Sequence, residues 1–335
     1  MMNFNRQKNT GLSIIELMIS MAVGLILIGG IASVYIASKR SYLEVERMSR
    51  MTQNGRFAIQ MVTEAIQHAG FVGEVPIGNI VQDVNLDALA ADCNDSAAAY
   101  DVEHYLFGAT ADANGAALGC IADAMPNSSI ILIKNVRPMR LVDSDDNGTI
   151  DTPLGIDNQT TYIISNNSRG VLFDGADTQP TITDGGDVPN GSAWEYQVQL
   201  YYVRDTAGDG SNPTLARRFL SWNAGAMGFV TEDLIAGVEA MSFLFGMDTT
   251  GNGEIDSYKT IGEMDSIEWT QVAAVEVDAL VRSETEDPNM DTSQTRTFNL
   301  GGLAAAITAD DNFHRLVMQN TVSLRNPKFV LRGNL

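Results

Sequence analysis

The feature that most constrains this chain is an apolar run close to its N-terminus. From Leu12 to Ala37 the sole charged side chain is Glu16, and the helix-breaking residues are limited to glycines at positions 24, 29 and 30. A run of 18 or more apolar residues is long enough to cross a bilayer as a helix. The sequence therefore predicts a transmembrane helix over residues 12–37.

A short polar leader, residues 1–11, precedes the apolar run. Its charged side chains are Arg6 and Lys8, and it ends in Gly11, whereas no small-x-small cleavage site follows the apolar run. An ordinary secretory signal would be removed together with its hydrophobic segment. In this chain the leader is the removable part, and we expect the hydrophobic helix to be kept.

This layout resembles the class III signal of type IV pilins and of type II secretion pseudopilins. The resemblance rests on Gly11 at the end of the leader, on Glu16 five residues into the mature chain, and on the long apolar helix. Leu12 stands where most members have Phe or Met, and residues 13–14 are Ser-Ile where most have Thr-Leu. The resemblance implies that a prepilin peptidase cleaves between Gly11 and Leu12 and methylates the new amino group of Leu12.

Glu16 also stands out on physical grounds. A lone carboxylate inside hydrocarbon costs roughly 2.5–3.5 kcal/mol on insertion scales, so it is a functional candidate by default. The resemblance implies that Glu16 pairs with the N-terminal amine of a neighbouring subunit and sets the register of assembly. In the alternative interpretation the helix is a simple membrane anchor, and Glu16 lies near the lipid headgroups.

After Ala37 the pattern becomes amphipathic and continues to about Ala69. Apolar residues recur at spacings of three, four and seven, which is typical of one buried face of a helix. These residues are Leu43, Met48, Met51, Ala58, Met61, Val62, Ala65, Ile66 and Ala69. We predict one helix over residues 12–69, about 85 Å long at 1.5 Å per residue. Its first half would lie in the membrane or filament core and its second half would cover a globular head, with Gly55 as a point of bending and Gly70 as the stop.

Two blocks near the end of this helix resemble the PilW-type minor pilins. They read TQNGRFA over residues 52–58 and AGFVG over residues 69–73, and Glu74 stands where the family often has Cys. Residues 234–246, where a strand precedes an acidic loop, and residues 313–327 resemble later blocks of the same family. We interpret Arg56 and Phe57 of the first block as a pair that packs the helix on a sheet.

Residues 70–335 are expected to form an α+β head, in which the long N-terminal helix packs on an antiparallel sheet with loop insertions. Residues 129–142 form an apolar run interrupted by Pro138, which indicates an edge or bulged strand. Residues 194–204 and 214–222 read as a hairpin. Residues 272–282 alternate, with Glu276, Asp278 and Arg282 on the polar face. We predict that residues 74–193 are a variable insertion that carries surface identity.

Charge limits the classes of partner. The chain has 335 residues and a formal net charge of −21 at pH 7. Binding to a phosphate backbone needs clustered Lys and Arg, so we expect no direct contact with nucleic acid. An acidic surface is compatible with cation binding and with solubility outside the cell.

The chain contains two cysteines, Cys93 and Cys120. An exported chain meets an oxidising compartment, so we expect one disulfide between them. The alternative is a reactive or metal-binding pair, but the two residues lack CxxC spacing and a nearby histidine cluster. In the chain-entropy model a disulfide that closes a loop of this length stabilises the fold by roughly 3–4 kcal/mol.

Two acidic loops, residues 143–151 and 248–256, repeat one pattern. The first offers Asp143, Asp145, Asn147, Thr149 and Asp151, and the second offers Asp248, Thr250, Asn252, Glu254 and Asp256. Oxygen donors at alternate positions, glycine at the sixth and a backbone carbonyl at the seventh are typical of the first nine residues of a calcium loop. Leu154 and Lys259 stand where such loops have a bidentate Glu, so each site would need a further ligand. The alternative is a pair of polar turns.

Enzymatic signatures are absent from the sequence. The three histidines occur in no HExxH spacing, and neither a G-x-S-x-G nor a P-loop motif is present. We therefore expect no catalysis and no required cofactor, with calcium as a candidate ion that stiffens the head.

The resemblance implies a minor pilin that acts in type IV pilus assembly, in a tip or priming complex. Its expected partners are prepilin peptidase, other minor pilins, the major pilin, the assembly platform of the bacterial inner membrane, and in some pili a tip adhesin. The head would be periplasmic before assembly and exposed on the pilus afterwards. Two alternatives stay open: a minor pseudopilin of a type II secretion system, and a pilus-displayed adhesive or ligand-binding module.

Overall fold

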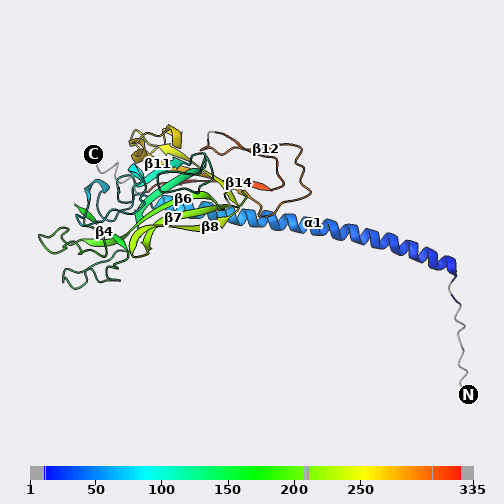
Figure 1. Cartoon of the computed structure of the whole chain (residues 1–335), viewed down its shortest axis with the longest axis horizontal. Coiled ribbons are helices and arrows are strands. Elements are labelled where there is room, and N and C mark those ends of the chain that lie inside the picture. The colour runs from blue at the N-terminus through cyan, green and yellow to red at the C-terminus, as the bar shows by residue number, and fades with distance from the viewer. Residues whose placement is uncertain (1–10, 12, 207, 209–210, 304, 326–335) are drawn as a thin grey trace, which may run out of the picture. The chain divides into compact units, whose positions relative to one another are not determined.

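The computed structural model describes residues 11, 13–206, 208, 211–303 and 305–325. The chain forms one long helix, α1 (Ile14–Gln67), and a head of β-strands, so the predicted α+β class is confirmed (Figure 1). The chain divides into two compact units, one ending at Arg50 and the other beginning at Met51. The head is the second of these units and includes the last turns of α1.

Helix α1 lies within the predicted range of residues 12–69. Leu12, the first residue of that prediction, is outside the described residues. The helix continues through Gly55 and ends at Gln67. Gly70 then takes a left-handed backbone conformation, with φ at +72°, and its N–H donates to the carbonyl of Lys134 at 3.0 Å. Because glycine adopts this conformation without steric cost, the chain turns out of the helix directly onto a strand.

The N-terminal unit carries the apolar part of α1. An 18-residue window of the helix has a mean hydropathy of 2.4, and none of that window is buried in the structure. By length and composition this segment is able to cross a membrane.

The strands of the head form three sheets. The largest has eight strands in the order β1-β5-β4-β6-β3-β2, with β7 paired to β6 and β8 paired to β7. Its strands are β1 (Ile80–Gln82), β2 (Leu106–Thr110), β3 (Ser129–Val136), β4 (Thr161–Ser165), β5 (Gly170–Asp174), β6 (Ser192–Asp205), β7 (Pro213–Asn223) and β8 (Ala226–Ala236). The second sheet has the order β10-β9-β11-β14, and the third pairs β12 with β13. Their strands are β9 (Val238–Met247), β10 (Ser257–Thr260), β11 (Val272–Arg282), β12 (Arg296–Phe298), β13 (Ile307–Ala309) and β14 (Arg315–Ser323).

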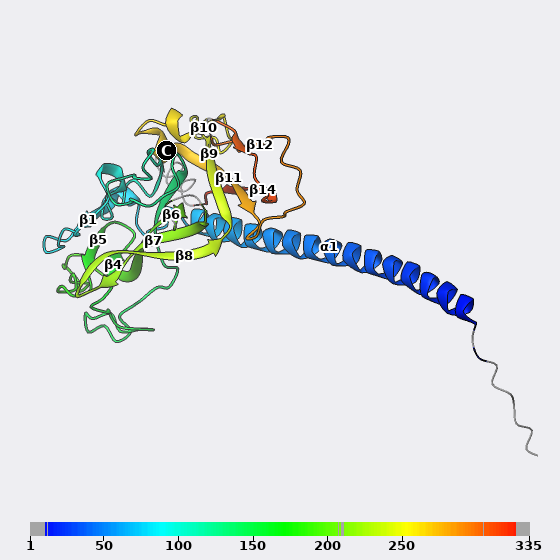
Figure 2. The same ribbon diagram turned by 45° about the vertical axis from the view of Figure 1, so that its right-hand side comes forward.

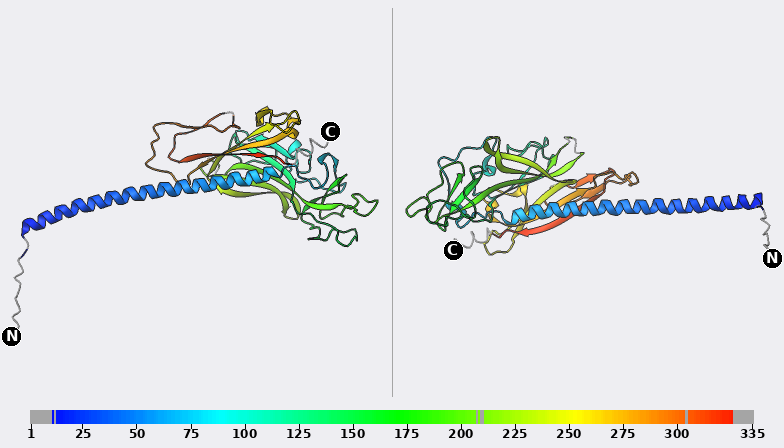
Figure 3. Two further views of the ribbon diagram at one scale, coloured as in Figure 1. Left: turned by 180° about the vertical axis from the view of Figure 1, so that it is seen from behind. Right: turned by 90° about the horizontal axis from the view of Figure 1, so that it is seen from below.

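Four short 3-10 helices complete the described elements; they are η1 (Ile77–Asn79), η2 (Asp95–Ala97), η3 (Ile261–Glu263) and η4 (Glu268–Gln271). Pairing within the sheets is antiparallel except between β1 and β5, which run parallel. The predicted hairpin is confirmed, since β6 and β7 pair from Gln199–Phe219 to Asp205–Pro213. Figure 3 shows the same strands from behind and from below.

Strand β3 corrects one prediction. The run before Pro138 was expected to be an edge or bulged strand, but β3 lies between β2 and β6, and all eight of its residues are buried. The strand ends at Val136, before the proline is reached. Pro138 therefore terminates the strand instead of interrupting it, and every N–H within β3 stays available for the two neighbouring strands.

The last turns of α1 fill the main core of the head. Ala58, Val62 and Ile66 are fully buried and belong to one apolar cluster with Phe243 and Val277 of the four-stranded sheet. Full burial of a large aliphatic side chain stabilises a fold by about 1.5–3 kcal/mol, so this face of α1 contributes substantially to the stability of the head. Residues Tyr201 and Val203 of β6 extend the same cluster onto the eight-stranded sheet.

Strand β11 is covered on both faces. Its alternating sequence places Asp278 and Arg282 on a face that is polar by composition, yet their exposed fractions are 4% and 8%. A lobe made of residues 283–314 covers this face, and Leu300 of the lobe packs on Leu280. Asp278 accepts a hydrogen bond from the N–H of Gly301 at 2.6 Å, so the buried carboxylate holds the lobe in place. Figure 2 shows β12 of the lobe beside β9 and β11.

An ion-pair network fastens the same lobe to β9. The side chain of Arg315 is 2% exposed and contacts the carboxylates of Glu239, on β9, and Asp311, in the lobe. One guanidinium nitrogen lies 2.8 Å from Glu239 Oε1 and 2.7 Å from Asp311 Oδ2. Arg296 adds a contact of 3.1 Å to Asp311 Oδ1. These four charged side chains share partners between β9, β14 and the lobe.

The segment predicted as an insertion, residues 74–193, supplies β1 to β5 of the large sheet. Its apolar side chains form two further clusters, one around Leu132 and Leu200 and the other around Ile164 and Phe173. The segment is therefore built into the head through its own cores.

Candidate functional site

The start of α1 forms a capping box. The hydroxyl of Ser13 accepts the N–H of Ile15 at 3.3 Å, and Glu16 Oε2 accepts the N–H of Ser13 at 2.9 Å. The first N–H groups of a helix have no partner within the helix, and a Ser-x-x-Glu pattern satisfies them in this way. The carboxylate of Glu16 consequently lies beside the backbone at Ser13. The S-x-x-E pattern of residues 13–16 was a signal that the sequence reasoning missed.

The predicted processing site lies directly before this cap. Gly11 is exposed, and Leu12 is outside the described residues. Cleavage between them would place a new amino group one residue ahead of Ser13 in the sequence. Whether this amino group pairs with Glu16 stays a prediction.

Gly55 allows α1 to approach the four-stranded sheet closely. A Cβ at this position would lie 2.4 Å from Sδ of Met318 and 3.1 Å from Cγ2 of Val281. Real Cβ atoms do not make contacts this short, so a larger residue would displace the Met318 side chain and crowd Val281. The helix continues through Gly55, and the small size of this residue has a packing role there.

Arg56 and Phe57 do not form the predicted packing pair. Both side chains are exposed, and Phe57 is 60% exposed. The helix places Met51, Gly55, Ala58 and Val62 on its buried face, and a face with this spacing turns residues 56 and 57 outward.

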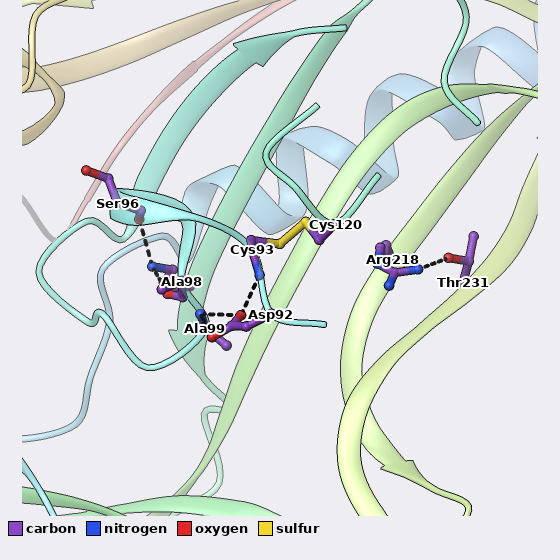
Figure 4. Close-up of a disulfide and its surroundings, with 9 residues drawn as sticks. Asp92, Cys93, Ser96, Ala98, Ala99, Cys120, Arg218 and Thr231 are labelled. Atoms are coloured by element: carbon purple, nitrogen blue, oxygen red, sulfur yellow. Dashed lines mark hydrogen bonds between the residues drawn. A yellow bond between two sulfur atoms is a disulfide. The ribbon is translucent and has the colours of Figure 1, made fainter. Parts of the chain in front are cut away.

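A disulfide joins Cys93 and Cys120, as predicted, across a sequence separation of 27 residues (Figure 4). The neighbouring carboxylate of Asp92 accepts the N–H groups of Cys93 at 2.7 Å and Ala99 at 3.0 Å. The disulfide and Asp92 together fix the loop of residues 92–101 over the large sheet.

Lys134 binds the same loop through hydrogen bonds to its backbone carbonyls. It lies on β3, is 1% exposed, and donates to the carbonyls of Ser96, Ala98 and Asp101 at 3.1, 2.7 and 2.6 Å. Burial lowers the pKa of Lys134 to about 8, although the nearby carboxylates of Asp101 and Asp92 oppose this shift. Buried lysines require partners, and three carbonyls satisfy the three ammonium donors. The sequence reasoning missed this residue because one lysine within an apolar strand looks like a solvent-facing position.

The first acidic loop brings its predicted ligands together. Single oxygen atoms of Asp143, Asp145 and Asp151 lie within 4.8 Å of one another. Asp143 Oδ2 accepts the N–H of Gly148 at 2.7 Å, and Asn147 Oδ1 accepts the N–H of Thr149 at 2.8 Å. Partial desolvation raises the pKa of Asp143, but the N–H groups that donate to it lower it below its ordinary value. The carboxylate therefore stays ionised at neutral pH.

The second acidic loop has the same internal hydrogen bonds at the same relative positions. Asp248 Oδ2 accepts the N–H of Gly253 at 2.7 Å, and Asn252 Oδ1 accepts the N–H of Glu254 at 2.7 Å. Asp256 accepts the N–H and the hydroxyl of Thr249, as Asp151 does from Ser144 in the first loop. Thr250 replaces the third-position carboxylate, so this loop offers less charge than the first.

The three histidines have separate local partners. His68 contacts the carbonyl of Glu64 at 2.9 Å, His104 contacts Asp101 at 2.7 Å, and His314 contacts Asp287 at 3.1 Å. Each of these contacts ties a loop or a helix end to its own neighbourhood. Among the described residues, these three ring contacts are with a backbone carbonyl or an aspartate and not with a serine, threonine or cysteine side chain, so they do not form the nucleophile–histidine pair of a hydrolytic triad.

Comparison with known families gives two matches. Residues 200–326 match the model of the type IV pilus-assembly protein W family, and residues 6–32 match the prokaryotic N-terminal methylation motif. The first match covers the second half of β6 and continues through β14, and the second covers residues 6–11 of the leader together with Ser13 and Glu16. Neither a curated protein nor a solved structure matches the chain at a significant level.

Proposed function

We propose that the chain is a PilW-type minor pilin that takes part in type IV pilus assembly within a tip or priming complex of minor pilins, a proposal that the matches of residues 200–326 and 6–32 support. The observation that carries the proposal is the Glu16 carboxylate beside the N–H of Ser13, within a matched methylation motif. Processing would release an amino group at Leu12, and a methylated amine is a cation that a carboxylate in hydrocarbon would pair with.

The proposed course of assembly follows from the cost of an unpaired charge. Prepilin peptidase cuts after Gly11, and the subunit stays in the inner membrane through α1 with its head in the periplasm. Glu16 then pairs with the amino group of a neighbouring minor or major pilin, which fixes the vertical register of the two helices. The subunit passes from the assembly platform into the pilus without catalysing a reaction.

The test replaces Gly11 and Glu16 separately in the native host. We expect Gly11→Val to leave a precursor that retains residues 1–11, and Glu16→Ala to be processed normally; both variants should lose surface pili. Glu46→Ala is the matched control, because Glu46 is on the same helix but contacts Arg50, an exposed neighbour, at 2.9 Å. Surface pili are scored by microscopy, and processing is scored by protein size.

Other outcomes would overturn the proposal. If pili persist in the Glu16→Ala strain while export of folded proteins stops, the chain serves a type II secretion system. If pili persist and adhesion is lost on deletion of head loops, the chain is an adhesive module that α1 displays. If neither replacement changes anything, α1 is a simple anchor.

We also propose that the loop of residues 143–151 binds calcium. The proposal is supported by the three carboxylates within 4.8 Å of one another and by the glycine-centred hydrogen bonds that pre-form the turn. With no Glu at the twelfth position, we expect weak affinity, about 0.1–1 mM, in the range of extracellular calcium modules.

The calcium test uses calorimetry on the full chain in detergent. Asp145→Asn should weaken the binding of calcium at least tenfold, whereas Asp157→Asn, at an exposed position outside this loop, should leave it unchanged. Absence of a binding signal at 5 mM calcium for the unmodified chain would contradict the proposal.

A further inference from the structure

A cavity of about 240 Å³ lies on the large sheet, beside the point of β6 at which its pairing changes from β4 to β7. We call it the β6 cavity, and the three strands are labelled in Figure 1. Its walls come from residues 159–161 at the start of β4, residues 195–199 of β6 and residues 219–221 of β7. Drug-sized ligands occupy pockets of about 300–1,000 Å³, so the β6 cavity fits a smaller molecule.

The backbone of β6 offers little to a ligand of this cavity. The register of β4 places Thr161 opposite Tyr196, and the register of β7 places Leu220 opposite Val198. Gln197, between these two pairs, directs its backbone groups toward β3, as does the residue two positions before it, whose carbonyl accepts a hydrogen bond from the end of β3. A ligand must therefore be recognised by side chains, which excludes the addition of an extended peptide as a further strand.

The charged side chains of the cavity already have partners. Glu195 accepts a hydrogen bond from Arg137 at 3.2 Å, and Arg217 donates to Glu232 at 2.8 Å. The guanidinium carbon of Arg217 also lies 4.7 Å from the ring centroid of Phe219. An ionic ligand would have to displace one of these charge-assisted hydrogen bonds, so the cavity favours an uncharged ligand.

Two glutamine amides of β6 are available to such a ligand. Gln199 Oε1 accepts hydrogen bonds from the hydroxyl of Tyr201 at 2.8 Å and from Arg217 at 3.2 Å, which fixes the amide and leaves its NH₂ group without a partner among the described residues. The amide of Gln197 makes no side-chain hydrogen bond within the same part of the chain. Residues two apart on a strand share a face and lie about 7 Å from each other. The two amides can therefore hold hydroxyl groups at two sides of one small ring.

Hydroxyl groups and an aromatic ring complete the lining of the cavity. Ser221 of β7 and Thr160 add hydroxyls, while Phe219 and Met227 add apolar surface. A sugar ring carries hydroxyls around its edge and C–H groups on its faces, and the face of an aromatic ring is electron-rich and attracts C–H groups. Uncharged amides and hydroxyls around one aromatic ring therefore match a sugar ring better than they match a wholly apolar molecule.

We propose that the β6 cavity binds one pyranose ring, which belongs to a free sugar or to the end of a glycan chain. Gln197 and Gln199 hydrogen-bond its hydroxyls, and Phe219 packs against its C–H groups. For a ligand of about twelve non-hydrogen atoms we expect a dissociation constant of about 1 mM. This inference goes beyond the assembly role and does not depend on it, because the cavity lies entirely within the head.

The first test is saturation-transfer NMR on the full chain in deuterated detergent. The probes are the methyl glycosides of glucose, galactose, mannose and N-acetylglucosamine, each titrated to about 20 mM. We expect at least one probe to give a signal that saturates, and the absence of saturation for all four overturns the proposal. A trisaccharide of the sugar that binds then separates the two sources. Affinity at least about tenfold higher than that of the methyl glycoside supports a glycan chain, and a smaller difference supports a free sugar.

The second test places the bound sugar in the β6 cavity. Gln197→Ala should weaken binding about fivefold or more, because one amide is lost, and Ser221→Trp should abolish binding by filling the cavity with a ring. Gln319→Ala is the matched control, since Gln319 is an exposed glutamine on β14 of the other sheet. The urea midpoint of each variant shows whether the head is folded. Unchanged binding by folded Ser221→Trp, or an equal loss in Gln197→Ala and Gln319→Ala, overturns the proposal.

Discussion

Replacing Arg315 with methionine should be among the most destabilising single changes in the head. The side chain is 2% exposed and contacts Glu239 and Asp311 together. Removing one member of a buried ion pair costs about 3–5 kcal/mol, because the remaining charges lose their partner without regaining water. At about 2–4 °C per kcal/mol for a domain of this size, the melting temperature should fall by about 10 °C.

The assay is urea unfolding of the full chain in detergent, followed by tryptophan fluorescence. Arg137→Met is the matched control, because Arg137 is 55% exposed and contacts Glu195 at 3.2 Å. Exposed pairs contribute about 0–1 kcal/mol, so this control should barely move the midpoint. If Arg315→Met and Arg137→Met shift the midpoint equally, burial is not what gives the Arg315 network its strength and the reasoning is refuted. A double-mutant cycle with Glu239→Gln would measure the coupling directly.

Four further outcomes can be measured on the same preparation. The hydrogen bond from Arg315 lowers the pKa of Asp311 to about 2. The stability that Asp311 contributes is therefore complete above about pH 5 and is lost as the pH falls toward 2. Because the Asp311 side chain is 37% exposed, we expect this pH-dependent part of the unfolding free energy to be about 1 kcal/mol and to be absent in Asp311→Asn. Lys134→Met should lower the free energy of unfolding by about 3 kcal/mol, because three carbonyls lose their hydrogen-bond donors. Equal urea midpoints for this variant and the unmodified chain would contradict this. Cys93→Ser should lower the free energy of unfolding by about 3–4 kcal/mol, and adding reductant to the unmodified chain should lower it by the same amount. Gly55→Leu should lower the free energy of unfolding by about 1–3 kcal/mol. An unchanged free energy of unfolding would show that Met318 of β14 moves aside for the new side chain.

The long helix and the disulfide could be predicted because each depends on a signal that one segment carries by itself. An apolar run of residues 12–37 has few structures available to it, and two cysteines in an exported chain have one pairing. The hydrogen bonds of the acidic loops are of the same kind, because Asp143, Asn147 and Gly148 lie within six residues. Whether an ion enters that loop depends on a ligand from outside it, which the nine-residue pattern does not specify.

The errors concern contacts between segments far apart in the chain. Phe57 looked like a core residue by composition, but the buried face of α1 is set by where β11 and β14 approach, and that approach requires Gly55. Lys134 could not be singled out from the sequence, because its three carbonyl partners come from residues 96–101. Periodicity alone carries no information on such partners, because it describes one element and not the layer that covers it.

The cover over β11 has a consequence for how relatives of this chain can diverge. Asp278 and Leu280 point into the lobe of residues 283–314, and Arg315 closes its far end. A lobe of different sequence would meet a carboxylate without its amide donor and an arginine without one of its acids. A lobe of different sequence should therefore keep this fold only if these positions of β11 and β14 change with it.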